Sequence, residues 1–541
     1  MAPGNGRRPI QTESSVLSSN RMHTSRGIVY LVGAGPGDTG LLTVRAADIL
    51  GRAQVVVYDA LVNPEILRLA PKDAEVVYGG KRAKEHALPQ EDLNQLLVNR
   101  AKEGKLVVRL KGGDPYVFGR GGEEAEELAA AGIAFEVVPG ISSTVAALAY
   151  AGIPITHRDF CSSYQVITGH EDPTKPETSL DWGAIAKAPG TKVVLMGVER
   201  IRHIAAELVR HGMPEQTPAA MIRWGTTGRQ KTVVGTLSTL ADVADAAGMS
   251  APAITVIGGV VSLRDRLNWF ETRPLFGNRI VVTRTREQAS TLVRQLIDRG
   301  AEVLEIPTIR IGPPTEIHPM IEAIAGLGEY NWIVFTSPNG VTAFFEYFFK
   351  AFDDIRSLGM IRFAAVGPAT AAKLSELHLR IDAMPTEYIA SKVAKAIAAV
   401  ENIENLRVLC LRAEVANPEL LKELEDMGGI VDDVACYQTL PETEDRTGAA
   451  ARLIEDGCDW ITFTSASTVE NFHLRFDLPK LIQRFPGIRT LSIGPETSKA
   501  LKALGLDATV EAKPHTIDGM VASLEKEVRK HARSLRGTNR Q

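Results

Sequence analysis

The sequence RLKGGDPYVFGRGGEE, from Arg109 to Glu124, follows a short apolar run and ends in an acidic segment. The apolar run at residues 105–108 predicts a strand, and the acidic end predicts the start of a helix. Glycine allows the backbone to take positive φ or to approach a ligand closely, and the proline after Asp114 disfavours helix at that position. A structural turn would explain some of the glycines, but Lys111, Asp114 and Arg120 among them favour a ligand-binding loop.

Length and composition indicate a globular protein with several domains. The chain has 541 residues, of which 44% are hydrophobic and 23% are charged, and single cores rarely grow beyond about 250–300 residues. The formal net charge of −4 gives no general case for nucleic acid or an anionic membrane as a partner. No apolar run approaches the roughly 18 residues of a membrane helix, and residues 1–26 lack a secretory signal and favour a disordered tail. Reduced core thiols in a cytoplasmic protein are expected, rather than a metal site or disulfides, for the scattered cysteines Cys161, Cys410, Cys436 and Cys458.

The start of the folded chain fits two kinds of nucleotide site. Residues 27–59 predict a strand, a helix and a second strand, which together form a βαβ unit of a parallel sheet. The GxGxxG pattern at 35–40, with Asp59 at the end of the next strand, matches a dinucleotide-binding fingerprint. However, Pro36 removes a loop amide, and Asp38 puts a carboxylate where a pyrophosphate would lie, although it is well placed as a helix cap. The nicotinamide hypothesis is therefore the weaker one.

A series of motifs in the first half resembles one enzyme family. They are VYLVGAGPGDTGLLTVRAADIL (29–50), VVVYDALV (55–62), GGKRAKEH (79–86), RLKGGDPYVFGRGGEE (109–124), VVPGISS (137–143), AGIPITHRDF (151–160) and LRDRLNWF (263–270). In this order they resemble the tetrapyrrole methylases, specifically uroporphyrinogen-III C-methyltransferase. The resemblance implies two α/β subdomains that bind S-adenosylmethionine in the cleft between them.

The resemblance also implies which residues contact the cofactor. By position, these are Pro36, Gly112, Gly113, Asp114, Val117, Ser142, Ser143, Met196 and Gly225. Backbone amides and an apolar methionine suit an adenine and a sulfonium, although Met196 could equally be a core methionine. Two sites depart from the family pattern, because Ser142 and Ser143 replace a common Thr-Ala pair and Gly228 replaces a common proline.

Asp59 and Lys81 match the proposed proton acceptor and proton donor of the methylase family. Methylation at a pyrrole carbon ends with loss of a proton, so a general base is expected. Alternatively, Asp59 caps a helix and Lys81 is a solvated charge. The porphyrinogen carries several carboxylates, so cations should surround it. The candidates, each of which could equally be surface charge, are Lys81, Arg82, His86, Arg120, His157 and Arg158.

The second half contains an internal repeat with a spacing of about 128 residues. The segment at 279–284 returns at 407–412, VFTSPNGV at 334–341 returns as TFTSASTV at 462–469, and AAVGPATAAKL at 364–374 returns as LSIGPETSKAL at 491–501. Strands alternate with helices in each repeat, which predicts two similar parallel-sheet lobes that arose by duplication. The helix starts after the Gly-Pro turns are expected to bind carboxylates.

This half resembles uroporphyrinogen-III synthase over roughly residues 276–525. The matching motifs are TRTREQA (283–289), TSPNGV (336–341), AVGPAT (365–370), CYQT (436–439), TFTSAST (462–468) and IGPET (493–497). The resemblance implies a duplicated, flavodoxin-like two-lobe fold whose lobes are joined by strands at 305–311 and 432–440. Tyr437 matches a cleft tyrosine that helps hydroxyl loss from hydroxymethylbilane, although it could be an ordinary strand tyrosine.

Little in this half suggests acid–base machinery, since paired carboxylates, a Cys/His couple and metal-ligand spacing are all missing from its sequence. The expected task is to position a flexible linear tetrapyrrole for ring closure. The side chains expected to hold its acid groups are Arg284, Arg286, Arg412, Thr336, Ser337, Thr464 and Ser465.

The predicted organisation is a fusion of two enzymes. Its parts are a disordered tail (1–26), a methylase (27–273, with subdomains of about 27–143 and 144–273), a linker (274–277), a synthase (278–525, with lobes of about 278–305 plus 438–525 and 306–437) and a basic tail (526–541). We expect cyclisation of hydroxymethylbilane to uroporphyrinogen III and two methylations to precorrin-2, in a protein that forms a homodimer through the methylase and uses no metal. An alternative is that one half binds or channels tetrapyrroles without turnover.

Overall fold

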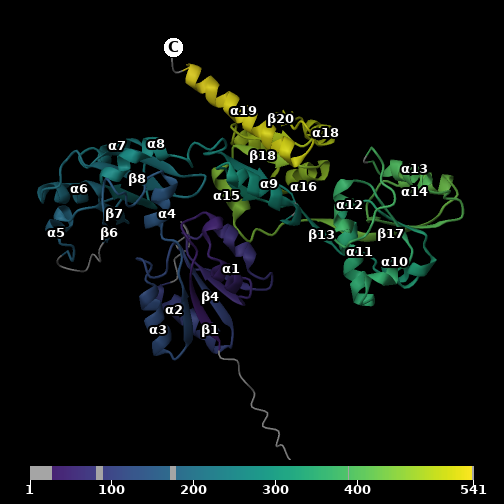
Figure 1. The fold of residues 1–541 in the computed structure, drawn as a ribbon, viewed down its shortest axis with the longest axis horizontal. Coiled ribbons are helices and arrows are strands. Elements are labelled where there is room, and N and C mark those ends of the chain that lie inside the picture. Colours follow the sequence, from purple (N-terminus) through teal and green to yellow (C-terminus); the bar gives the residue numbers. More distant parts are fainter. Residues whose placement is uncertain (1–26, 81–88, 171–177, 285, 388, 539–541) are drawn as a thin grey trace, which may run out of the picture. The chain divides into compact units, whose positions relative to one another are not determined.

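The computed structural model describes residues 27–80, 89–170, 178–284, 286–387 and 389–538. Lys81, Arg82 and His86 therefore lie outside the described residues. The chain divides into two compact units, the first ending at Trp269 and the second beginning at Phe270 (Figure 1). Among the described residues, no helix is both long enough and apolar enough to cross a membrane.

The first unit begins with a parallel five-stranded sheet in the order β3-β2-β4-β1-β5. Its strands are β1 (Ile28–Gly33), β2 (Val55–Tyr58), β3 (Glu75–Tyr78), β4 (Leu106–Lys111) and β5 (Ala134–Val138). Its helices are α1 (Val44–Leu50), α2 (Gln90–Lys102) and α3 (Gly121–Ala130). Alternate residues of the central strands pack against α1 on one face and against α2 and α3 on the other (Figure 1). Burial of both faces explains why β1 and β2 are apolar along almost their whole length, whereas β4 also carries the buried charges of Arg109 and Lys111.

A second sheet in this unit has the order β6-β7-β10-β8-β9 and is mixed. Only β6 and β7 pair in parallel, whereas β10 runs antiparallel to β7 and β8, and β9 runs antiparallel to β8. The strands are β6 (Tyr164–Thr168), β7 (Thr191–Leu195), β8 (Pro218–Arg223), β9 (Lys231–Thr236) and β10 (Ala253–Ile257). The helices are α4 (Ser143–Tyr150), α5 (Trp182–Lys187), α6 (Ile201–Arg210), α7 (Leu240–Ala246) and α8 (Arg264–Leu267).

The second unit contains two further five-stranded sheets. The first is parallel, in the order β12-β11-β18-β19-β20, and consists of β11 (Arg279–Val282), β12 (Glu302–Glu305), β18 (Trp460–Phe463), β19 (Arg489–Ser492) and β20 (Val510–Glu511). Its helices are α9 (Arg286–Asp298), α15 (Ala449–Asp456), α16 (Ala466–Phe476), α17 (Leu478–Arg484), α18 (Pro495–Ala503) and α19 (Ile517–Thr538).

The other sheet of this unit has the order β13-β17-β16-β14-β15 and is parallel except for β13. It consists of β13 (Ile309–Gly312), β14 (Trp332–Phe335), β15 (Arg362–Ala365), β16 (Arg407–Ala413) and β17 (Ile430–Pro441). Its helices are α10 (His318–Ala325), α11 (Pro338–Ala351), α12 (Pro368–Ser375), α13 (Val393–Ala398) and α14 (Glu419–Asp426).

The two sequence repeats are divided between these two sheets. The first repeat supplies β11 and β12 to one sheet and β14 and β15 to the other, and the second repeat supplies β16 and β17 to one and β18 and β19 to the other. By the repeat, β11 and β12 match β16 and β17, and β14 and β15 match β18 and β19. The order β12-β11-β18-β19 in one sheet therefore corresponds to β17-β16-β14-β15 in the other. Each sheet therefore combines the first strands of one repeat with the later strands of the other.

Three features differ from the expected boundaries in this half. Leu275, expected in a linker, is fully buried in the core of the second unit. The expected lobe boundary at 437–438 falls inside the continuous strand β17, which pairs with β16 along its first part and with β13 along its end. Helix α19 continues to Thr538, beyond the point at 525 where a basic tail was expected to fray.

Candidate functional site

The loops after β1, β4 and β5 meet backbone to backbone at one edge of the first sheet. Gly35 and Gly113 form a bridge, with N···O distances of 3.2 and 2.7 Å. A Cβ on Gly33 would lie 2.5 Å from Cα of Gly140, so the contact requires glycine. The connections from the adjacent strands β1 and β4 lead to opposite faces of the sheet, and ligands of α/β proteins bind where the chain diverges in this way.

Asp114 joins the β4 loop to the β5 loop. Its Oδ2 accepts a hydrogen bond from Gly140 N at 3.0 Å, and its Oδ1 accepts one from Tyr116 N at 2.8 Å. Gly113 beside it has φ of +70°. A Cβ built on Gly113 would have Ser142 Cα as its one near neighbour, at 4.0 Å, so the space next to Gly113 is open. Asp114 therefore holds the loop after β4 in its conformation. Gly112, Gly113 and the exposed Val117 belong to the same loop.

The second sheet presents Met196 and Gly225 at its own edge. Met196 follows β7 and Gly225 follows β8, and these strands point the same way on either side of β10, so their ends lie about 10 Å apart. Met196 is 50% exposed with φ of 54°, which excludes the alternative of a core methionine. Trp224 and Thr226 also have positive φ, and such strain in non-glycine residues gathers at functional sites.

Helix α4 lies between the two sets of loops. Ser142 caps the helix, because its hydroxyl accepts from Thr144 N at 3.3 Å, and Ser143 is the first residue of the helix. A Cβ on Gly225 would lie 2.5 Å from Cβ of Ala147 in this helix. The loop after β1, which contains the half-buried Pro36, reaches the loop after β8 through a hydrogen bond from Asp38 N to Thr226 Oγ1 at 3.0 Å. The structure thus links Pro36, Gly112, Gly113, Asp114, Ser142, Ser143 and Gly225 through contacting elements.

Asp59 lies just after β2 and belongs to a network of partly buried charges. Arg109 donates to Asp59 Oδ1 at 2.6 Å and to Glu124 Oε1 at 3.2 Å, and Lys111 Nζ lies 2.7 Å from the same Glu124 oxygen. Arg109, Lys111 and Glu124 are almost fully buried, whereas the Asp59 side chain is 29% exposed. Burial lowers the pKa of Lys111, the charge of Arg109 lowers it further, and Glu124 opposes both. Lys111, whose charge among the glycines favoured a ligand-binding loop, faces the buried Glu124, and Asp59 is the member of the network that solvent reaches.

The other cations predicted for the first unit lie in more exposed places. Arg120 has φ of 59° at the start of α3 and pairs with Glu123, and both side chains are exposed. His157 and Arg158 lie in the segment between α4 and β6, where the His157 ring packs against Phe160 at 5.3 Å. These contacts leave their role in binding substrate a prediction.

In the second unit, Tyr437 and Ser337 meet. The Tyr437 hydroxyl lies 2.9 Å from Ser337 Oγ, and Ser337 caps α11 by accepting from Gly340 N at 3.1 Å. Tyr437 is only 7% exposed, and burial raises the pKa of its phenol, although Ser337 and Asn339 oppose the shift. The phenol is therefore held at the N-terminus of α11, and its raised pKa favours the protonated form.

The remaining predicted residues of this unit divide into two groups. Thr336 precedes the α11 cap, Ser465 caps α16 with Thr464 just before it, and the half-buried Arg284 follows β11, where burial lowers the pKa of its guanidinium. Arg412 differs, because it is buried and both its Nε and a terminal nitrogen bind the Asp433 carboxylate at 2.5 and 2.6 Å. This pairing argues against the prediction that Arg412 binds a substrate carboxylate.

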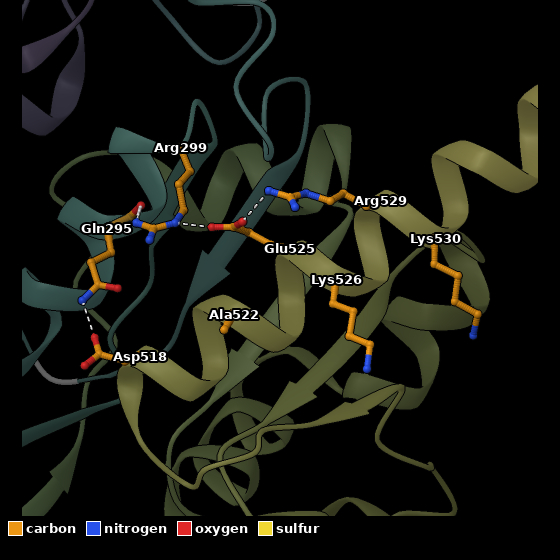
Figure 2. Close-up of a pocket in the computed structure, with 8 residues that line it drawn as sticks. All are labelled: Gln295, Arg299, Asp518, Ala522, Glu525, Lys526, Arg529 and Lys530. Carbon is orange, nitrogen blue, oxygen red and sulfur yellow. Dashed lines mark hydrogen bonds and ion pairs between the residues drawn. The ribbon is translucent and has the colours of Figure 1, made fainter.

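A groove on the second unit contains none of the predicted site residues. It lies between α9 and α19, and Figure 2 shows Glu525 between Arg299 and Arg529, whereas Lys526 and Lys530 point away from this acid. Glu525 pairs with Arg299 and Arg529, and Gln295 donates to Asp518 at 2.7 Å. Because these groups satisfy each other, the groove is a weaker candidate than the Tyr437 site. Among the described residues, no cluster of His, Cys, Asp or Glu is placed to hold a metal ion.

Sequence reasoning missed the partners of the charged residues. Arg109 and Lys111 stand two apart on a buried strand, so they share one face of the sheet, and such a pair requires a buried acid. That signal was available, but it does not say that Glu124 supplies the acid. Asp433 and Asn339 gave no comparable signal, because only the complete fold brings Asp433 to Arg412 and Asn339 to Tyr437.

Comparison with known families agrees with this division into two units. Residues 28–241 match the family of Tetrapyrrole (Corrin/Porphyrin) Methylases, and residues 290–522 match Uroporphyrinogen-III synthase HemD. The first unit thus carries a methylase domain and the second a synthase domain, as the motifs in the sequence indicated.

Curated relatives match the whole chain or its first part. The "Porphyrin biosynthesis protein HemD" of Ruminiclostridium josui is 40% identical over 500 residues, which cover 92% of this chain and 97% of that protein. A "Uroporphyrinogen-III C-methyltransferase" of Bacillus subtilis (strain 168) is 40% identical over 384 residues, covering 71% of this chain and 78% of that protein. An "S-adenosyl-L-methionine-dependent uroporphyrinogen III methyltransferase" of Methanosarcina barkeri is 54% identical over 246 residues, covering 46% of this chain and 96% of that protein. The chain belongs to the family of enzymes that join a tetrapyrrole methylase to a uroporphyrinogen-III synthase.

Proposed function

We propose that the second unit cyclises hydroxymethylbilane to uroporphyrinogen III and that the first unit methylates this product twice to precorrin-2. The observation that carries the methylase assignment is the meeting of the β1, β4 and β5 loops, through close glycine contacts, at the divergence point of the sheet. The names of the relatives support the choice of tetrapyrrole substrate and cofactor.

The residues of the first unit fit S-adenosylmethionine, which supplies the methyl group when bound. The open position at Gly113 and the backbone groups around it suit a nucleoside that must approach the chain closely. The half-exposed Met196 offers an apolar contact to a sulfonium, and Val117 adds apolar surface. Pro36, Ser142, Ser143 and Gly225 complete the proposed binding set.

Asp59 is the proposed proton acceptor of the methylase. Methyl transfer to a pyrrole carbon leaves a proton that must depart, and the Asp59 carboxylate is the solvent-reached member of the charged network. Arg109 fixes one of its oxygens at 2.6 Å, so the carboxylate is oriented before substrate arrives. Lys81 remains a proposed proton donor, and Arg120, His157 and Arg158 remain proposed contacts for the substrate acids.

The proposed synthase site centres on Tyr437 and the helix N-termini beside it. The phenol donates to the hydroxyl that leaves hydroxymethylbilane, and Thr336, Ser337, Thr464, Ser465 and Arg284 hold its acid side chains. The two lobes are proposed to be flavodoxin-like copies, since the first has its strands in the order 2-1-3-4-5 when they are numbered along the chain.

Three further proposals concern the molecule as a whole. The methylase corresponds to the first unit and the synthase to the second, and two copies of the chain associate through the methylase. The cytoplasm is the proposed location, because the four free cysteines suit a reducing compartment.

The test is to incubate the full-length protein with hydroxymethylbilane, with and without S-adenosylmethionine, and to resolve the products. We expect uroporphyrinogen III without the cofactor and a dimethylated product with it. Uroporphyrinogen I alone would show that the second unit does not turn over and only binds or channels tetrapyrroles. An unmethylated type III product in the presence of the cofactor would contradict the methylase assignment.

Tyr437→Phe is expected to lower the rate of cyclisation about tenfold and to raise the uroporphyrinogen I share of the product. A positioned proton donor contributes about 10²–10⁴-fold, and the reactivity of this substrate favours an effect below that range. A slower enzyme also competes with spontaneous closure, which proceeds without ring inversion. The measurement is isomer analysis by chromatography beside a melting curve.

Tyr347→Phe is the matched control, because Tyr347 also lies on the second unit and its ring contacts Lys350. It should keep the wild-type rate and isomer ratio. A stable Tyr437→Phe protein that behaves in the same way would show that Tyr437 is only structural.

A further inference from the structure

Tyr150 ends helix α4 and reaches back to the first subdomain. Its hydroxyl donates to Asp38 Oδ2 at 2.7 Å. The other oxygen of Asp38 accepts from Gly40 N at 2.8 Å, and the backbone N–H of Asp38 donates to Thr226 Oγ1 at 3.0 Å. Asp38 is therefore a junction at which the β1 loop, the β8 loop and α4 are joined.

The elements joined at this junction carry four of the nine proposed cofactor contacts. Asp38 stands two residues after Pro36, and Thr226 follows Gly225 directly. Helix α4 has Ser142 and Ser143 at its first end and Tyr150 at its last. A shift of Tyr150 relative to Asp38 would therefore change the distance between the two sides of the proposed site.

The position of Tyr150 is itself fixed by the end of the unit. Arg264 donates to the carbonyl of Ala151, and Trp269 Nε1 donates to the carbonyl of Ala149 at 3.0 Å. The ring of Trp269 lies 5.0 Å from the Tyr150 ring at an interplanar angle of 62°. These contacts hold the Tyr150 ring in place without its hydroxyl, so the hydroxyl is available to align the loops.

We propose that Tyr150 is a positioning residue whose bond to Asp38 sets the spacing of the cofactor-binding loops. This inference rests on the proposed function, because it concerns the affinity for S-adenosylmethionine. A site that is already aligned loses less freedom on binding, so removal of the bond acts on affinity first. The bond is strong for its kind, because the acceptor is a carboxylate.

The test is Tyr150→Phe in the full-length protein. We expect the Kd for S-adenosylmethionine to rise about tenfold, because loops that are no longer held in place must be ordered when the cofactor binds. The KM for the cofactor should rise in parallel, while kcat at saturating cofactor stays within about twofold, because the residue does not touch the reacting atoms. Calorimetry and methyl-transfer kinetics measure the two effects.

Tyr164→Phe is the matched control, since Tyr164 lies in the same unit and its hydroxyl has no hydrogen-bond partner among the residues described. If Tyr150→Phe does not fold, Thr226→Ala, which removes the acceptor of the Asp38 N–H, should raise Kd in the same direction. A folded Tyr150→Phe protein, or in its place Thr226→Ala, with the Kd of the wild type overturns the inference. Failure of the wild type to bind S-adenosylmethionine would instead overturn the proposed function.

Discussion

Replacing Glu124 with alanine is expected to lower the free energy of unfolding of the first unit by about 3–5 kcal/mol. Glu124, on α3, is the acid that both Arg109 and Lys111 of β4 contact, and all three side chains are almost fully buried. Its removal takes away the carboxylate that Lys111 contacts and leaves Arg109 with the Asp59 carboxylate and two backbone carbonyls. Chemical unfolding of the full-length protein measures the loss, and hydrogen exchange of the β4 amides assigns it to this unit.

Glu123→Ala is the control for this prediction. Glu123 is the adjacent residue, and its pair with Arg120 is exposed on both sides, so its removal should cost less than about 1 kcal/mol. Equal losses for the two variants would show that the buried network adds nothing beyond a surface pair. Glu124→Gln keeps a hydrogen-bond acceptor without the charge, so its loss in the free energy of unfolding should lie between those of Glu123→Ala and Glu124→Ala.

Asp114→Ala is expected to weaken S-adenosylmethionine binding about 10–100-fold while cyclisation in the second unit continues. The carboxylate accepts hydrogen bonds from two backbone amides, and removal of such a charged acceptor costs about 1.5–3 kcal/mol. The loop after β4 then loses its hydrogen bond to Gly140 N, and the conformation of the loop around Gly113 is no longer fixed. Calorimetry with the cofactor measures the first effect, and cyclisation of hydroxymethylbilane measures the second.

Asp242→Ala provides the comparison for Asp114, because Asp242 is an exposed carboxylate of the same unit and pairs with Arg202. Its affinity for the cofactor should equal that of the wild type. An Asp114→Ala protein with the same affinity would mean that the loop keeps its shape without the carboxylate, and that Asp114 does not touch the cofactor.

Local chemistry explains which parts of the candidate site could be predicted. The glycines and the proline around Asp114 restrict the chain within a few residues, so the loop after β4 was predictable as a loop. Asp38 was expected to cap a helix, and it does cap the short turn at Thr39–Leu41. An alternating or continuous apolar pattern likewise identified most strands, because burial on one or both faces leaves that pattern.

Contacts between distant residues explain what could not be predicted. Strand direction in the second sheet depends on which edges meet, and the apolar pattern of β8 is the same in a parallel or an antiparallel pair. Arg412 looked available for a substrate because Asp433 lies on another strand, and only the register of β16 with β17 brings them together. Leu275 looked like part of a linker because the short segment Pro274–Gly277 gives no sign of the distant core residues against which this leucine packs.

The division of the two repeats between the sheets determines which sheet of the second unit can be completed first during synthesis. All five strands of the β13-β17-β16-β14-β15 sheet leave the ribosome after β12 and before β18. That sheet can form while β11 still lacks its neighbour β18. The apolar residues Ile280 and Val281 of β11 are then not covered. An unpaired apolar strand invites association between nascent chains. Within the second unit, one edge of β11 therefore stays unpaired until β18 has been synthesised.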